Sequence, residues 1–149
     1  MMTQDLAPVV QTVEVDCSLE VAFKTFTEGI GSWWPLDTHS IGEDKIDKMV
    51  FEERAGGRVY EIWQDGHEEP WADILVWEPP RRFVLAWHPN PEATVSTEVE
   101  VSFEETDRAT MVRLEHRNWE VLGDAAAQVR LNYDTDWPKV LDRLRSATA

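Results

Sequence analysis

Three residues of the chain could carry acid–base chemistry or anchor a ligand, namely His116, Glu61 and Tyr133. His116 alternates with Val112 and Leu114, so we expect the three side chains on one face of a strand, turned toward a long helix that carries Tyr133. A histidine in a cavity can move a proton near neutral pH or orient a ligand. The alternative is a hydrogen-bonded histidine of the core.

Glu61 alternates with Val59 and Trp63, so its carboxylate is buried if that face of the strand is the inner one. A buried carboxylate needs a partner, and it could serve as a general base or as a ligand anchor. The alternative is a structural ion pair with one of three arginines: Arg58, Arg82 or Arg113.

The chain has eight tryptophans, which is many for 149 residues. Large aromatic rings line ligand cavities as well as fill cores, so the tryptophans of the strands predict an aromatic cage or, alternatively, core packing. Strict alternation puts Trp71 and Trp77 on one face of their strand together with Asp73 and Leu75. The candidate ligand-binding residues are Glu61, Trp63, Trp77, Trp87, His116, Tyr133 and Trp137.

The sequence lacks the motifs of metal sites, phosphate-binding loops and serine nucleophiles. The four histidines, His39, His67, His88 and His116, have no metal-ligand spacing. The sequence has no glycine-rich phosphate loop and no Gly-x-Ser-x-Gly elbow. We therefore expect no metal, no cofactor and no serine nucleophile.

Alternation and turn residues predict a strand, two short helices, six more strands and a long final helix. Ser18 is a good N-cap for the first helix, and Trp33-Trp34-Pro35 ends the helical stretch because the residue before proline avoids the helical region. The predicted strands span 9–16, 48–54, 58–64, 71–77, 82–88, 95–104 and 110–117, with proline breaks at Pro79-Pro80 and Pro89-Asn90-Pro91.

The final helix is predicted from an apolar stripe that includes Tyr133, Trp137 and Leu141. Asp124 could cap its start, and Pro138 predicts a kink or a short break near Asp136–Pro138. Strands joined by hairpins and followed by a helix indicate an α+β fold, with the curved sheet of about seven antiparallel strands wrapped around the helix.

The amino-acid composition limits the kinds of partner that the protein can bind. The formal net charge is −15, which excludes nucleic acid and anionic membranes because both attract basic surfaces. No apolar run is long enough for a membrane span. The single cysteine, Cys17, cannot form an internal disulfide, and no signal peptide is apparent, so we expect a cytoplasmic protein. The sequence leaves the oligomeric state open.

The chain resembles a known superfamily. The resemblance rests on Gly57–Glu61, Asp65-Gly66, Trp71, Val76–Phe83, Trp87, Val112–His116 and the late Trp137, Val140, Leu141 and Leu144. These segments are similar to those of the SRPBCC (START-like) superfamily, in its activator-of-heat-shock-protein-90-ATPase-homologue branch. The resemblance implies one helix-grip domain over residues 1–149, with a core of about 9–146 and a cavity between sheet and final helix.

Three functions follow as hypotheses. The first is a binding protein that encloses a small hydrophobic or aromatic molecule in the cavity. The second is a cofactor-independent enzyme of the cyclase or hydrolase type, with His116, Glu61 or Tyr133 as acid or base. The third is a chaperone-accessory or stress-related module that binds another protein. Fold alone does not choose among them, because the superfamily hosts many functions.

Overall fold

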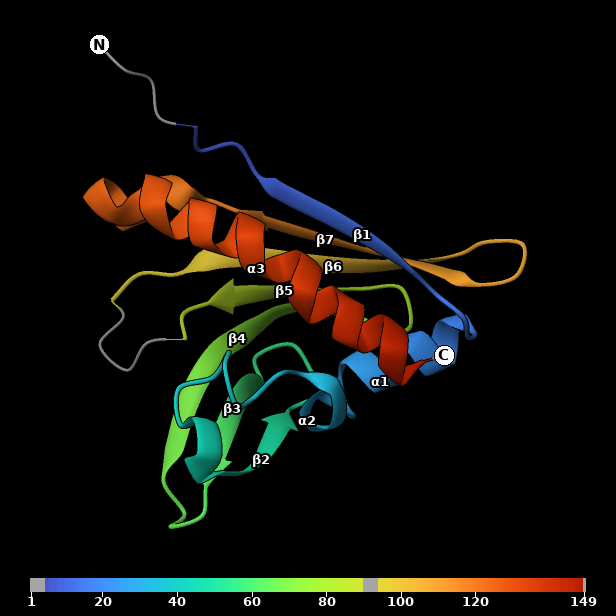
Figure 1. Ribbon diagram of the computed structural model, residues 1–149, viewed down its shortest axis with the longest axis horizontal. Coiled ribbons are helices and arrows are strands. Elements are labelled where there is room, and N and C mark those ends of the chain that lie inside the picture. The colour runs from blue at the N-terminus through green and yellow to red at the C-terminus, as the bar shows by residue number, and fades with distance from the viewer. Residues whose placement is uncertain (1–4, 90–93, 149) are drawn as a thin grey trace.

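The computed structural model describes residues 5–89 and 94–148, in which a seven-stranded antiparallel sheet packs against a long C-terminal helix (Figure 1). The sheet order is β1-β7-β6-β5-β4-β3-β2. The strands are β1 (Val9–Val15), β2 (Ile46–Phe51), β3 (Arg58–Trp63), β4 (Glu68–Glu78), β5 (Arg82–Trp87), β6 (Thr97–Glu105) and β7 (Thr110–Arg117). The predicted α+β helix-grip fold is confirmed. Asn90 and Pro91, part of the second proline break, lie outside the described residues.

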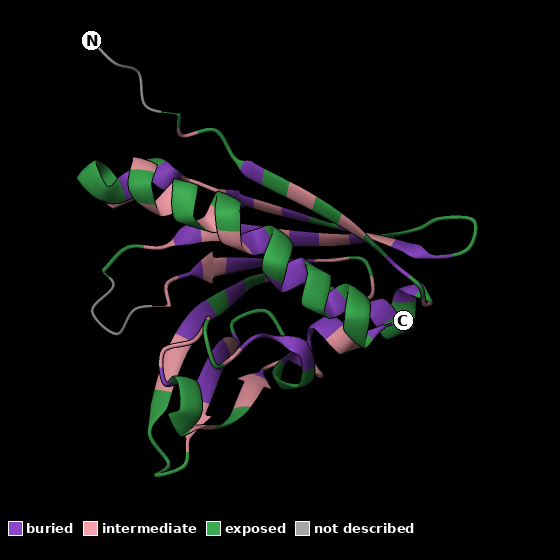
Figure 2. Cartoon of the chain, in the orientation of Figure 1, coloured by how far each residue is buried: buried purple, intermediate pink, exposed green. Residues whose placement is uncertain are grey.

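The core lies between the inner face of the sheet and the helices (Figure 2). Burial alternates along β6 and β7, because every second side chain points to the core. Val112, Leu114 and His116 are all fully buried, as the alternation predicted. Within the described part of the chain, no helix combines the length and apolarity needed to cross a membrane.

Two short helices follow β1. In α1 (Leu19–Phe26), the Ser18 hydroxyl accepts a hydrogen bond from the Val21 amide, which satisfies one free N–H at the helix start. Helix α2 (Ile30–Trp33) ends where Trp34 adopts an extended conformation before Pro35. The loop that follows contains the 3-10 turn η1 (Glu43–Lys45). These segments bring Trp34 against Trp71 of β4 and the loop against Glu61 of β3.

Helix α3 (Ala126–Ala147) follows the 3-10 segment η2 (Trp119–Ala125). The expectation that Asp124 caps it is wrong, because the N-cap is Ala125 and no side chain caps it. Of the kink or short break expected near Asp136–Pro138, the break does not occur, because the helix runs through Pro138. The proline leaves the carbonyl of Asp134 without its helical partner, but both residues are on the exposed side, where water can replace the lost bond.

Strand β4 departs from strict alternation. Its pairing shifts by one residue near Val59/Tyr60 of β3 and again between Ile74 and Val76. Each bulge reverses the side on which later residues point. Trp71 is therefore buried, whereas Asp73 and Leu75 are exposed, so the expectation that Trp71 shares a face with Asp73 and Leu75 is wrong. Trp71 and Trp77 do both pack toward the core.

Candidate functional site

A pocket of about 310 Å³ lies between α3, the strands β4 and β5, and the loop after α2. We call it the first pocket. Its walls are mainly aromatic and its rim is polar. It is lined by Trp34, His39, Ser40, Ile41, Trp71, Trp87, Pro89, Val129, Asn132, Tyr133, Asp136, Trp137 and Val140. The volume is at the lower end of the range for small-molecule pockets, roughly 300–1,000 Å³.

Four indoles form the deep wall of the first pocket. The ring of Trp34 lies 5.1 Å from that of Trp71 and 5.8 Å from that of Trp137, measured between centroids. Trp87 lies 5.7 Å from Trp137. The rings meet at tilted or edge-on angles, which is the arrangement that aromatic quadrupoles favour. Such a wall offers both faces and edges of rings to a flat apolar molecule.

The rim of the first pocket carries charge. His39 Nε2 lies 3.7 Å from an oxygen of Asp136 on α3, and His39 Nδ1 is 2.7 Å from the Thr38 hydroxyl. The His39–Asp136 contact joins the loop to α3 at the pocket, and Thr38 holds the imidazole from within the loop. His39 and Asp136 could not be selected from the sequence, because His39 comes from a loop without a motif and Asp136 from the polar side of the helix stripe. Trp34 was recognised only as part of the signal that ends the helical stretch, not as a residue of the pocket.

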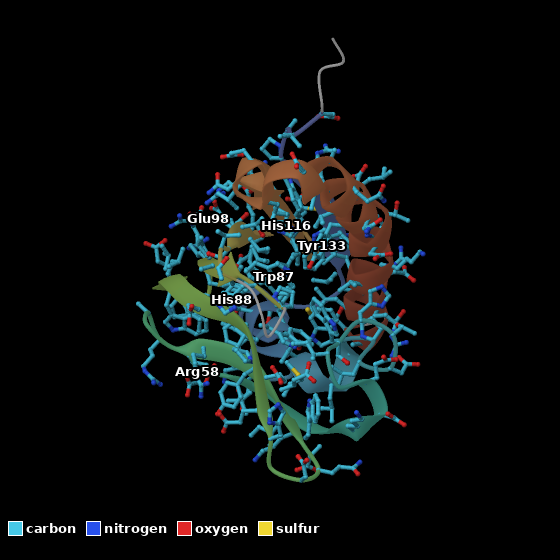
Figure 3. All side chains as sticks on the ribbon, turned by 90° about the vertical axis from the view of Figure 1, so that its left-hand side faces the viewer. Arg58, Trp87, His88, Glu98, His116 and Tyr133 are labelled. Atoms are coloured by element: carbon cyan, nitrogen blue, oxygen red, sulfur yellow. The ribbon has the colours of Figure 1, made fainter. Side chains whose placement is uncertain are left out.

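His116 lies behind this wall, beneath α3, with Trp87 and Tyr133 close to it (Figure 3). The indole N–H of Trp137 donates to His116 Nδ1 at 3.0 Å. Because Nδ1 accepts, the neutral ring carries its proton on Nε2, which lies 2.7 Å from the hydroxyl oxygen of Thr97. Both nitrogens are thus engaged within the protein, so acid–base work by His116 would first require breaking one of these bonds.

Burial lowers the pKa of His116 from 6.5 to about 3, because the charged ring would lose its hydration. The unfolded histidine keeps a pKa near 6.5, so the unfolded chain binds the extra proton between pH 6.5 and 3. Stability from the neutral ring is therefore complete above pH 6.5 and is lost as the pH falls through this window.

We expect the free energy of unfolding to fall faster with acidification in the native protein than in His116→Gln. The difference in slope between pH 6 and pH 4 is about 1.4 kcal/mol per pH unit. Glutamine can still accept from Trp137 and donate to Thr97, so the variant keeps the hydrogen-bond pattern. Urea unfolding at a series of pH values measures both slopes, and parallel curves would contradict the assignment.

Tyr133 is one of the polar residues of α3 that line the first pocket, together with Asn132 and Asp136. Its oxygen accepts a hydrogen bond from the indole N–H of Trp87 at 2.9 Å. Burial raises the pKa of Tyr133; the Trp87 hydrogen bond opposes the shift, while the charge of Asp136 adds to it. The hydroxyl therefore keeps its proton at neutral pH, and no acceptor for that proton is found among the described residues.

Glu61 is fully buried and lies behind the pocket lining, where it contacts the lining residues Ile41 and Trp71. Each of its carboxylate oxygens receives two hydrogen bonds. Oε1 accepts from the Ile41 amide at 2.9 Å and the Trp71 indole at 2.7 Å. Oε2 accepts from the Gly42 amide at 2.5 Å and the Trp63 indole at 2.7 Å. We call these five residues the Glu61 cradle; it fixes both the loop and the Trp71 wall of the first pocket.

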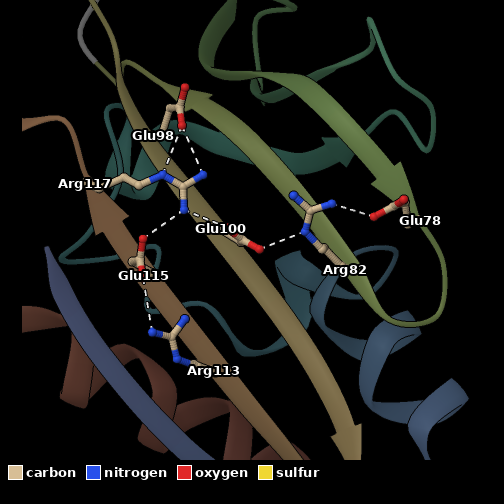
Figure 4. A network of polar contacts seen from close by, with 7 residues as sticks. All are labelled: Glu78, Arg82, Glu98, Glu100, Arg113, Glu115 and Arg117. Carbon is tan, nitrogen blue, oxygen red and sulfur yellow. Dashed lines mark hydrogen bonds and ion pairs between the residues drawn. The ribbon is translucent and has the colours of Figure 1, made fainter.

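The cradle replaces the arginine partner considered for Glu61. Arg58 pairs with Glu68 at 3.3 Å, and Arg82 and Arg113 belong to a network on the outer face of the sheet (Figure 4). That network joins Glu78, Arg82, Glu98, Glu100, Arg113, Glu115 and Arg117. The ion-pair alternative is wrong because outward-pointing arginines meet the glutamates of neighbouring strands, whereas Glu61 points inward.

The sequence candidates thus divide into three groups. Trp87, His116, Tyr133 and Trp137 come together under α3. Glu61 and Trp63 meet in the cradle. Trp77 lies apart, with its ring 5.1 Å from Phe23 and 5.8 Å from Phe51, in the packed end of the core. Among residues 5–89 and 94–148, no three His, Cys, Asp or Glu side chains gather so as to hold a metal ion.

Comparison with known families agrees with this architecture. The profile of the activator of Hsp90 ATPase homolog 1-like proteins matches residues 16–149. The chain belongs to this family. The SRPBCC-type resemblance deduced from the sequence is thereby confirmed. No curated protein matches the sequence of this family member.

Solved structures of the same fold include proteins with stated activities. CalC from Micromonospora echinospora, a self-sacrificing resistance protein, is 28% identical with a TM-score of 0.74, over 96% of this chain and 94% of that one. Txn09, an anthrahydroquino-gamma-pyrone synthase, is 29% identical with a TM-score of 0.60, over 97% and 99%. The Aha1 dimer from Colwellia psychrerythraea, at 19% identity and a TM-score of 0.67 over 95% and 96%, shows the fold alone.

Proposed function

We propose that this protein binds a small, flat, hydrophobic or aromatic molecule in the first pocket. The observation that carries the proposal is the wall of four indoles, Trp34, Trp71, Trp87 and Trp137, at the bottom of a pocket of about 310 Å³. Aromatic rings bind apolar surfaces strongly, and the polar rim would orient the molecule. Similarity to a resistance protein and to a synthase supports a role toward small molecules.

Native mass spectrometry of the freshly purified protein tests the proposal. We expect a mass excess of a few hundred daltons, the size of ligand that such a pocket encloses, and it should disappear on denaturation. Asn132→Trp would place an indole in the pocket mouth, since Asn132 lines the pocket and is exposed, and the excess should vanish. Asp134→Trp is the matched control, because Asp134 is exposed on the same helix and does not line the pocket.

Two results would count against binding in the first pocket. One is a mass excess that survives Asn132→Trp as well as it survives Asp134→Trp. The other is a bare protein that also fails to change its tryptophan fluorescence when titrated with naphthalene derivatives, since four indoles line the pocket and report on any aromatic guest.

A second candidate function is turnover of the bound molecule without a cofactor, favoured by the 29% identity to a synthase. His116 has both nitrogens engaged, so the hydroxyl of Tyr133 is the better proton donor toward the pocket. Incubation of the released ligand with excess protein would reveal turnover as a change in the mass of the ligand. We rank the chaperone-accessory role third, because exposed large apolar side chains in the described chain come from separate segments.

A further inference from the structure

A second pocket, of about 340 Å³, adjoins the first. The two pockets share four lining residues: Trp87, Pro89, Val129 and Tyr133. The hydrogen bond between the Trp87 indole and the Tyr133 oxygen, 2.9 Å long, therefore lies in the wall that separates them. Beyond this wall the second pocket is lined by residues of η2 and β6, among them Trp119, Leu122 and Thr97.

Trp119 is the unusual residue of the second pocket. It is fully buried, and its ring stacks on His116 with centroids 4.0 Å apart. Its indole N–H is the one buried side-chain polar atom in the described part of the chain without a hydrogen-bond partner. Buried polar groups almost always have partners, because an unpaired one loses its hydration without replacement. Because Trp119 lines the second pocket, a small movement of its ring would bring this unpaired donor to an acceptor that arrives with a ligand.

Two neighbouring polar side chains already have partners within the protein. Thr97 is hydrogen-bonded to His116, and His88 to Asp73 at 3.0 Å, so neither needs the acceptor of a ligand. The hydroxyl of Tyr133, which lines both pockets, supplies a second proton without an acceptor in the described chain. Two donors and no nearby cation suit a neutral oxygen acceptor such as a carbonyl, since a buried carboxylate would lack a counter-charge.

We propose that the second pocket is the acceptor subsite of one divided binding site. This inference rests on the proposed function. The aromatic body of the ligand lies in the first pocket, and a short arm carries a neutral carbonyl oxygen past Trp87 and Tyr133 to the N–H of Trp119. The ligand class is thus an aromatic ketone or a similar neutral oxygen-bearing aromatic. The arm must be long enough to pass the Trp87–Tyr133 pair, which lies between the two pockets.

The test uses 2-naphthyl ketones with one to three methylene groups between ring and carbonyl, each paired with the alkene in which C=CH2 replaces C=O. Affinities are measured by quenching of tryptophan fluorescence. We expect one ketone to bind about tenfold more tightly than its alkene, the value of one hydrogen bond to an otherwise unpaired donor. Trp119→Phe should bring the affinities of ketone and alkene to within about twofold of each other, because phenylalanine has no N–H to donate while it keeps an aromatic ring on His116.

If Trp119→Phe folds poorly, nuclear magnetic resonance of the native protein can test the subsite instead. In the native protein, the indole N–H signal of Trp119 should move downfield and exchange more slowly with the ketone than with the alkene. Equal affinities of ketone and alkene for the native protein, with no selective shift of that signal, would overturn the subsite and leave the first pocket standing. Failure of every naphthyl probe to bind would overturn both.

Discussion

Glu61→Gln is expected to lower the free energy of unfolding by roughly 2–6 kcal/mol. The carboxylate accepts four hydrogen bonds, two at each oxygen. The amide of glutamine has one oxygen, so its NH2 group would face two N–H donors that have no other partner. Each buried donor that loses its acceptor costs about 1–3 kcal/mol. Urea unfolding followed by circular dichroism measures the loss.

Glu68→Gln is the matched control, because Glu68 lies nearby at the start of β4 but is exposed and pairs with Arg58 on the surface. A surface ion pair contributes little, so the control should lose less than about 1 kcal/mol. A loss for Glu61→Gln no larger than that of the control would show that the Glu61 cradle is not what fixes the loop. Ligand affinity should fall with Glu61→Gln and not with the control, because the cradle holds the Trp71 wall.

Gly42→Ala is expected to destabilise the protein by about 3 kcal/mol, at the upper end for an added methyl group in a packed site. A Cβ at position 42 would lie 2.3 Å from Trp63 Nε1 and 2.7 Å from Glu61 Oε2, both too close for a contact. The loop or the indole would have to move, and the cradle would open. Thermal and urea unfolding both measure the effect.

Gly31→Ala provides the control for the added methyl group. Its Cβ would lie 3.5 Å from the Cβ of Met49, an ordinary contact, and alanine suits the helical position in α2. We expect the variant to be as stable as the native protein or up to about 1 kcal/mol more stable. Equal effects at positions 31 and 42 would contradict the close approach described for Gly42.

The sequence predicted the fold well because its signals are local. Alternation in residues 110–117 put His116 on the inner face, and the pairing of Trp34 with Pro35 marked the end of α2. The partners of Glu61 could not be predicted from the sequence, because two of them are backbone amides of a loop without a pattern. The bulges in β4 were equally hidden, since a residue inserted into the pairing leaves no mark in composition.

The pocket walls illustrate the same limit. Trp87, Tyr133 and Trp137 could be proposed because their strand and helix have clear apolar stripes. Trp34 reaches the same wall from the end of a four-residue helix, and its position depends on the path of the loop. That path is fixed by Glu61, far along the chain, so only the folded structure shows that the two residues serve one site.

The pairing of β1 with β7 affects how the chain can fold during synthesis. Val9 lies opposite His116, so the first strand has no partner until more than a hundred further residues have been added. Trp87 of β5 likewise lacks its partners Trp137 and Tyr133 until α3 has left the ribosome. Structures dominated by such distant contacts fold slowly and expose apolar surface on the way. The nascent chain should therefore spend its synthesis in a state that general chaperones recognise, whatever the finished protein binds.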